Sequence, residues 1–268
     1  MYLNCIIDNI EKIMNIVISF NDAIDEYNNY DIYHKKIFNS NGVSFSEIKS
    51  NFLLKNSKGF SGERKSSLFN ISCDVVAKKN DSMERDYEYS SKRFFSDLPE
   101  PKKIGKLAAK RASYRLNPKK INSFRGPAVF EPRVSSSFLS HLISSISGHN
   151  LARKVSFVKG DIGEILFQEN INVIDDPLIK KGLGSKNFDS EGVSCAKLRL
   201  INNGKLNEIL LDTYSGKMLS KKTNGRCGGT TNCYFENGKI SKTDLIKDIK
   251  KGVYITELFG SGFNSVFN

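Results

Sequence analysis

The spacing of apolar and polar positions changes along the chain, and these changes predict a mixture of helices and strands. Residues 4–27 carry apolar side chains at helical intervals, beginning with Ile6 and Ile10, so we expect a helix there. After a turn signal at residues 39–42, residues 43–81 alternate short β-favouring runs with Gly, Asn and Ser. This second pattern predicts about three strands joined as antiparallel hairpins.

A lysine-rich amphipathic helix is predicted next. Pro99 and Pro101 open it, and it stops near Asn117 and Pro118. Its spacing turns four apolar residues toward a core and four basic residues toward water. The apolar residues are Ile104, Leu107, Ala108 and Leu116, and the basic residues are Lys103, Lys106, Lys110 and Arg111. The densest cluster of positive charge is therefore explained as the solvated face of a helix.

The second half of the chain begins with a short buried strand, whose centre is Val129 and Phe130. The segment SSFLSHLISSISGHNLARK then predicts a helix with Ser135 or Ser136 as its N-cap and Gly148 at its end.

Short extended runs separated by glycine-rich turns follow. The run of Asn202, Asn203 and Gly204 predicts a hairpin with KLRLI and KLNEILL as its arms. A last helix is expected at residues 242–252, with Leu245, Ile246 and Ile249 on its apolar face. The resulting fold class is α+β, with a second half that is mostly β.

Two histidines lie on the predicted helix that starts near Ser135, but they do not make a zinc site. On a continuous helix, His141 and His149 are about 12 Å apart, at about 1.5 Å per residue. Zinc needs its two nitrogen ligands within about 4 Å of each other. A helical zinc peptidase also needs a carboxylate beside the first histidine, and residues 135–150 contain no Asp or Glu. His149, near the helix end, favours the negative end of the helix dipole.

The remaining candidate groups are interpreted as structural. Cys227 and Cys233 are too widely spaced for a common zinc motif, and no second cysteine pair is available. Gly225, Gly228 and Gly229 can present backbone N–H groups to an anion, but no phosphate-loop signature surrounds them. No nucleophile elbow is present.

Composition bounds the class of protein. Among 268 residues, 39% are hydrophobic and 10% aromatic, as in a folded protein. The net charge of +12 raises the possibility of nucleic acid as a partner, but the lysines are spread along the chain, so specific nucleic-acid binding is not favoured. The 5 scattered cysteines indicate reduced thiols. Acidic Asp8 and Glu11 argue against a signal peptide, and no apolar run is long enough to span a membrane, so we expect a cytoplasmic protein.

Five ordered segments carry a family resemblance. They are DSMERDYEYS, LIKKGLGSKNFDSEGV, GKLNEILLDTYSGKML, TNGRCGGTTN and GVYITELFGSGFN. Together they resemble the TldD/PmbA family, in its PmbA (TldE) branch, from about Asn39 onward. The resemblance implies a bacterial or archaeal protein that forms one half of a TldD–TldE heterodimer. In that family the TldD half holds zinc through a His-Glu-x-x-x-His helix and a later cysteine, and degrades unfolded or short peptides.

The resemblance also assigns site residues. A register anchored on RKVSF puts Leu139 and Ser144 at the two histidine positions and Ser140 at the glutamate position. This implies no catalytic residue, metal ligand or cofactor in this chain, with zinc held by the TldD-type partner. Other family-motif positions are expected to line or shape the peptide channel. They are Asp189, Ser190, Glu191, Gly192, Gly228, Gly229, Asn232 and Glu257.

Two roles remain open for the FDSEGV motif. Gly192 is expected to supply a backbone angle that other residues disfavour. Asp189 and Glu191 are expected either to accept backbone N–H bonds from the neighbouring loop or to line the channel, and we favour the first role.

The expected domains are residues 1–122, the remainder of an N-terminal α/β domain, and residues 123–268, a mostly antiparallel β domain of the TldD/PmbA type that lacks its last strands. Compared with the family pattern, we expect the chain to be truncated at both its N-terminal and its C-terminal end. The leading hypothesis is a non-catalytic subunit of a heterodimeric zinc peptidase, with a TldD-type subunit and unfolded or short peptides as partners. The alternatives are a basic nucleic-acid-associated or gyrase-modulating protein, and an inactive remnant of gene decay.

Overall fold

The computed structural model describes residues 37–258, and these residues form two compact units. The first unit contains residues 37–51 and Lys65–Asn122, and the second contains Phe52–Arg64 and residues 123–258. The helix expected at residues 4–27 lies outside the described residues. The mixture of helices with antiparallel sheets confirms the α+β class.

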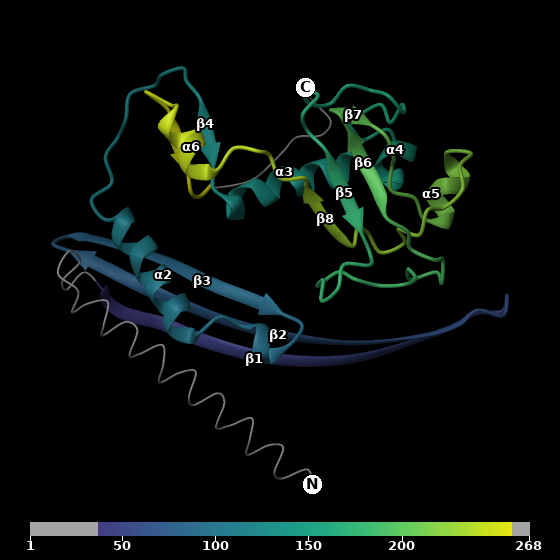
Figure 1. The fold of residues 1–268 in the computed structure, drawn as a ribbon, viewed down its shortest axis with the longest axis horizontal. Coiled ribbons are helices and arrows are strands. Elements are labelled where there is room, and N and C mark those ends of the chain that lie inside the picture. Colours follow the sequence, from purple (N-terminus) through teal and green to yellow (C-terminus); the bar gives the residue numbers. More distant parts are fainter. Residues whose placement is uncertain (1–36, 259–268) are drawn as a thin grey trace, which may run out of the picture. The chain divides into compact units, whose positions relative to one another are not determined.

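The first unit is built on a three-stranded sheet in the order β1-β2-β3 (Figure 1). Its strands are β1 (Ile37–Lys55), β2 (Ser61–Lys79) and β3 (Ser82–Lys92), and β2 pairs with β3 in antiparallel register. Every second residue of one stretch of β2 is buried, because alternate side chains of a strand face the same side. These residues are Ile71, Cys73, Val75 and Ala77.

The prediction of a turn at residues 39–42 was wrong, because β1 runs through them and sheet pairing overrides the local turn preference. Residues 43–81 hold two long strands, β1 and β2, rather than about three short ones, and the third strand starts at Ser82. The expected antiparallel hairpin is confirmed for β2 and β3.

Helix α2 (Pro101–Arg115) covers this sheet and has the bounds that the prolines predicted. The prediction for Leu107 was wrong, since its side chain is 37% exposed. Small residues form most of the buried face instead, so the helix axis lies close to the sheet and no room is left for a leucine there. The buried apolar positions are Ile104, Gly105, Ala108, Ala109 and Ala112.

The second unit contains a four-stranded sheet in the order β7-β6-β5-β8, antiparallel throughout (Figure 1). The strands are β5 (Val173–Asp176), β6 (Leu198–Asn202), β7 (Lys205–Leu206) and β8 (Asn232–Phe235). The predicted hairpin joins β6 to β7, and Asn203 and Gly204 have φ values of 49° and 76°. Both angles are positive, as a type I′ turn requires.

The other elements of this unit are short. They are β4 (Ala128–Phe130), α3 (Pro132–Ser145), α4 (Gly148–Ala152), α5 (Thr213–Met218), α6 (Lys242–Lys247) and β9 (Val253–Ile255). Strands β4 and β9 pair in parallel, and β4 is only half-buried. Helix α6 is shorter than expected, with Leu245 and Ile246 42% and 39% exposed.

The helix expected between Ser135 and Gly148 was placed wrongly at both ends. Helix α3 begins at Pro132 with Glu131 as its N-cap, because a proline at the first helical position loses no hydrogen bond. It ends at Ser145, and Gly148 starts the separate helix α4. The break is fixed by tertiary contact, since the Gly148 amide donates to the Leu210 carbonyl at 2.8 Å.

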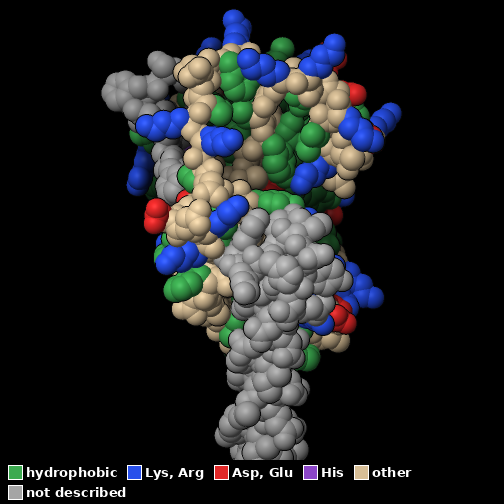
Figure 2. All heavy atoms as spheres, turned by 90° about the vertical axis from the view of Figure 1, so that its left-hand side faces the viewer, with side chains coloured by type: hydrophobic (Ala, Val, Ile, Leu, Met, Phe, Trp, Pro, Cys, Tyr) green, Lys and Arg blue, Asp and Glu red, His purple; other side chains and the backbone are tan. Residues whose placement is uncertain are grey.

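On the face that Figure 2 presents, Lys and Arg side chains are interspersed with hydrophobic and uncharged ones and form no continuous patch. None of the helices between residues 37 and 258 combines the length and the hydrophobicity needed to cross a lipid bilayer.

Candidate functional site

The FDSEGV motif forms a loop closed around a buried carboxylate. Asp189, 1% exposed, accepts the backbone N–H groups of Glu191 and Val193 through Oδ1, both at 2.9 Å. Its Oδ2 accepts the backbone N–H of Cys227 at 3.0 Å, which ties the motif to the glycine-rich loop. Gly192 has φ +80°, the left-handed angle expected of it.

Glu191 connects this loop to the start of α5. Its Oε2 accepts the Thr213 backbone N–H at 2.9 Å and the Thr213 hydroxyl at 2.6 Å. Asp212 caps the same helix, since its Oδ1 accepts the Ser215 backbone N–H at 2.7 Å while the Ser215 hydroxyl donates to it as well. Two carboxylates therefore meet at one helix start, where N–H groups are unpaired within the helix.

Asp212 also holds His149. The imidazole Nε2 lies 2.7 Å from Asp212 Oδ2, and the ring stacks on Tyr214 with centroids 5.7 Å apart. Burial raises the pKa of Asp212, but the donors on Ser215 and His149 outweigh it, so the pKa is lowered overall. His149 stands in α4 and His141 in α3, so the two histidines do not share a helix. A side-chain partner, rather than a helix dipole, positions His149.

A buried ion pair anchors the glycine-rich loop. Arg226 Nε donates to Asp175 Oδ2 at 2.5 Å, and neither side chain is exposed. Asp175 Oδ1 also accepts the N–H and the hydroxyl of Thr231, at 2.7 and 2.9 Å. Arg226 further donates to three backbone carbonyls, including that of Ala196 at 2.6 Å. Because both charges are fully hydrogen-bonded, the pair fixes the loop on strand β5.

Four more of the expected motif positions lie in or against this loop. Gly228 and Gly229 have φ values of 84° and 93°, and a Cβ on Gly228 would lie 2.9 Å from the Ser190 hydroxyl oxygen. Asn232 accepts the Gly184 N–H at 2.8 Å and donates to the Asp176 carbonyl at 2.7 Å. Seven of the eight positions thus belong to one assembly of loops.

The eighth position, Glu257, is exposed in the segment after β9. 

Three ligand-type side chains converge where the loops meet. One carboxylate oxygen each of Glu191 and Asp212 and the Cys227 sulfur lie within 4.8 Å of one another, and all three residues are half-buried. Burial raises the pKa of the Cys227 thiol, the charges of Glu191, Asp189 and Asp212 raise it further, and the charge of Lys186 only partly opposes this shift. Such a thiol is not activated as a nucleophile, because the thiolate is the reactive form.

The sequence pattern did not indicate this convergence. Cys227 and His149 looked like ordinary residues, because the contacts that matter come from Glu191 and Asp212, which are remote in the chain. A weak signal for Asp212 was available, since an Asp three positions before Ser215 is typical of a helix cap.

In helix α3, the three positions that the resemblance equates with a His-Glu-x-x-x-His zinc motif carry Leu139, Ser140 and Ser144. Leu139 packs against the core of the second unit. The Ser140 hydroxyl donates to the Ser136 carbonyl at 3.2 Å, and Asn150 Nδ2 donates to the Ser144 carbonyl at 2.8 Å. A leucine and two serines offer no zinc ligand of the usual kind.

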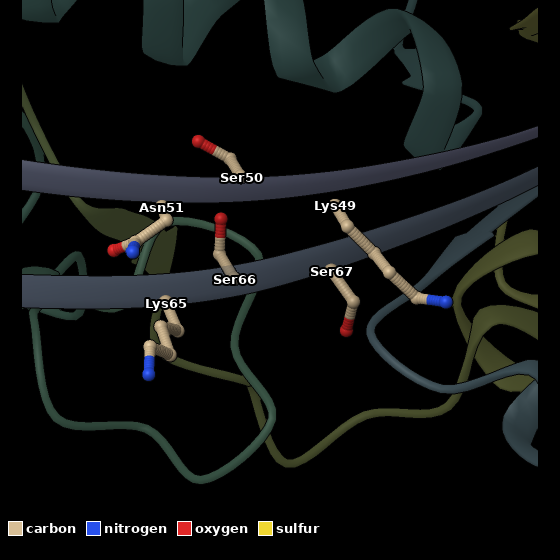
Figure 3. A pocket seen from close by; sticks show the side chains of 6 residues that line it. All are labelled: Lys49, Ser50, Asn51, Lys65, Ser66 and Ser67. Carbon is tan, nitrogen blue, oxygen red and sulfur yellow. The ribbon is translucent and has the colours of Figure 1, made fainter.

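A pocket of about 450 Å³ lies beside β1 and β2 in the first unit. Figure 3 shows its six lining side chains, on two neighbouring strands. They are Lys49, Ser50, Asn51, Lys65, Ser66 and Ser67. This lining contains no carboxylate, imidazole or thiol, so it offers neither metal ligands nor a general base at neutral pH.

Two family models match the chain. Residues 8–116 match the PmbA/TldA metallopeptidase central domain, and residues 123–267 match the C-terminal domain of the same family.

Curated relatives include a metalloprotease PmbA homologue from Buchnera aphidicola, 36% identical over 87% of this chain and 52% of its own length. Metalloprotease PmbA from Escherichia coli O157:H7 is 32% identical over the same shares. The chain therefore spans about half the length of these relatives.

Solved structures show the same fold. A putative modulator of DNA gyrase from Bacteroides thetaiotaomicron superposes with a TM-score of 0.84 at 27% identity, over 93% of this chain and 56% of that one. TldE from Thermococcus kodakarensis superposes with a TM-score of 0.66 at 25% identity, over 81% of this chain and 51% of that one.

Proposed function

Because the chain belongs to the PmbA/TldD metallopeptidase family, we propose that it acts as a non-catalytic, PmbA-type subunit whose TldD-type partner supplies the zinc chemistry. The proposed assembly is a heterodimer that degrades unfolded or short peptides in the cytoplasm. One of the relatives is named a TldD homologue, which supports a partner of that type.

The observation that carries this proposal is the chemistry of α3. Its only residue with a ligand-type side chain is His141, and it contains no Asp or Glu. A zinc peptidase needs several protein ligands and a group that takes a proton from the bound water. If α3 is the counterpart of a zinc helix, this subunit keeps the helix without its ligands.

The rigid loops suggest the subunit's contribution. Asp189, Glu191 and Asn232 each bind groups in neighbouring loops, and the buried Arg226–Asp175 pair fixes the same region. We propose that these loops shape one wall of a peptide channel, and that Glu257 adds to it. The family models match on either side of residues 117–122, which supports a domain boundary near residue 122.

Co-expression with a TldD-type protein from the same genome tests the assembly. The two chains should elute together from a size-exclusion column in equal amounts. As a matched control, an exposed residue outside these loops, Lys79 at the end of β2, is changed in Lys79→Ala, and this variant should elute in the same way. Separate elution of two folded proteins would exclude the heterodimer.

A second function, nucleic-acid binding, has two observations in its favour. The net charge is +12, and the Bacteroides relative carries the name putative modulator of DNA gyrase. A genuine DNA-binding role predicts an affinity that survives physiological salt and falls steeply with further salt. Affinity lost below physiological salt would discard this function. A chain that neither associates nor folds would instead favour the remnant of gene decay.

A further inference from the structure

The most informative unassigned feature is the meeting point of three loops at Glu191, Asp212 and Cys227. Their oxygen and sulfur atoms lie within 4.8 Å of one another, although the residues come from separate segments of the chain. We propose that these three side chains form a binding site for a divalent cation of the zinc type. This site is distinct from α3, and it does not depend on the proposed subunit role.

The surrounding bonds orient the ligands. Thr213 holds Glu191 through Oε2, whereas Asp212 is held at both oxygens, at Oδ1 by Ser215 and at Oδ2 by His149. Glu191 therefore keeps Oε1 for a cation, and Asp212 Oδ2 keeps a second lone pair beside its bond to His149. The backbone of Cys227 is fixed by its N–H bond to Asp189. A site whose ligands are held in place loses little conformational entropy on binding.

Among the described residues, the two carboxylates at this point have no lysine or arginine in direct contact, although the charge of Lys186 acts on Cys227. Neither Glu191 nor Asp212 forms an ion pair with a lysine or arginine in the described part of the chain. Only His149 pairs with Asp212, although the protein carries 41 lysines and arginines. Two carboxylates that form no direct pair with a described lysine or arginine, beside a thiol, are a suitable environment for a bound cation.

The ligand set selects the kind of metal. Thiolate favours zinc and cobalt over magnesium and calcium, which prefer oxygen alone. Zinc bonds of about 2.0 to 2.3 Å place tetrahedral ligands about 3.5 Å apart, so the cluster must close by roughly 1 Å. Half-buried side chains can make such a movement by small rotations. Three protein ligands leave a fourth position for water.

His149 is a positioning residue in this arrangement. Its Nε2 donates to Asp212 Oδ2 and sets the orientation of that carboxylate. Groups that orient metal ligands typically change affinity by about 10- to 100-fold when they are removed.

Cobalt titration of the full chain tests the site directly. The protein carries no histidine tag, is stripped with a chelator and is kept reduced. We expect one Co²⁺ per chain and a thiolate-to-cobalt charge-transfer band, which only a cysteine ligand produces. Absence of this band at saturating Co²⁺ would overturn the proposal without the need for any variant.

Variants then identify the ligands. Cys227→Ser should abolish the band, and Glu191→Gln should weaken binding about tenfold or more. Cys233→Ser is the matched control, because Cys233 lies on β8 outside the cluster, and it should leave the band unchanged. His149→Ala should keep the band but weaken affinity about 10- to 100-fold. A band that survives Cys227→Ser, or that Cys233→Ser removes, would contradict the assignment.

An alkylation assay covers the case in which a variant fails to fold. In the unmodified chain, Zn²⁺ should protect Cys227 from iodoacetamide, as read by peptide mass spectrometry. Equal modification of Cys227 with and without Zn²⁺ would also overturn the site.

Discussion

Single residues fix the loops around the candidate site, and each does so through one identifiable interaction. Asp189 gathers three backbone N–H groups, Gly192 supplies a left-handed angle, and Arg226 neutralises Asp175 in the interior. Substitution of each residue should lower the free energy of unfolding by a different amount, so the contribution of each interaction can be measured.

Gly192→Ala should lower the free energy of unfolding by about 2 kcal/mol, because an L-residue is strained at φ +80° and its Cβ would lie 2.7 Å from Phe60. Gly229→Ala has the strained angle without a close neighbour and should cost about 1 kcal/mol. Gly238 has neither a left-handed backbone angle nor a close neighbour, so Gly238→Ala should change the free energy of unfolding little. Urea unfolding measures all three, and equal effects would contradict this ranking.

Arg226→Met should cost about 3 to 5 kcal/mol, because it leaves the carboxylate of Asp175 buried without its counter-charge. The matched control is Arg199→Met, which breaks a partly exposed pair with Glu236 and should cost about 0 to 1 kcal/mol. Denaturant unfolding of both variants decides the point. Similar losses of unfolding free energy in the two variants would contradict the claim that the Arg226–Asp175 pair is buried away from water.

The buried thiols predict a pH dependence. Burial raises the pKa of Cys73 to about 11 and that of Cys233 to about 12. Above the ordinary thiol pKa of about 8.5, the unfolded chain ionises while the folded thiols stay neutral, so their stabilising contribution is lost as the pH rises toward these values. At pH 9, iodoacetamide should therefore modify both slowly in the folded protein and quickly in urea. Rapid modification without urea would contradict the raised pKa values.

At the scale of elements, periodicity predicted most helices and strands but not their detailed contacts. The hairpin at Asn203–Gly204 and the helix opened by Pro101 were predictable, because turn and capping chemistry is local. The break between α3 and α4 was not, since it depends on the Gly148 contact with Leu210, which is remote in the sequence. The candidate site was predictable only through family motifs, and the meeting of Cys227 with Asp212 had no local signal.

Helix α2 offers a test of which face is buried. Ala112→Leu should cost about 1 to 3 kcal/mol, because Ala112 is fully buried against the sheet and a larger side chain overpacks it. Leu107→Ala should cost less than about 1 kcal/mol, because this leucine is 37% exposed. Thermal or urea unfolding compares the two. If Leu107→Ala lowered the stability more than Ala112→Leu, the side chain of Leu107 would face the core, as the sequence predicted.

At the scale of the whole molecule, family membership and the chemistry of α3 lead to one account. The chain has the fold of a metallopeptidase family and spans about half the length of its curated relatives. Its sequence resemblance predicts that Leu139, Ser140 and Ser144 of α3 replace zinc-site residues. The expected consequence is a subunit that supports hydrolysis without performing it.

Peptide hydrolysis by the reconstituted pair tests this account most directly. An unfolded peptide substrate is incubated with zinc and with this chain alone, the TldD-type partner alone, or both. The account predicts cleavage by the pair, none by this chain alone, loss of cleavage when the partner's His-Glu-x-x-x-His glutamate becomes glutamine, and rates within about twofold for Ser140→Ala or Ser144→Ala. Chelator-sensitive cleavage by this chain alone, or its abolition by Ser140→Ala, would contradict it.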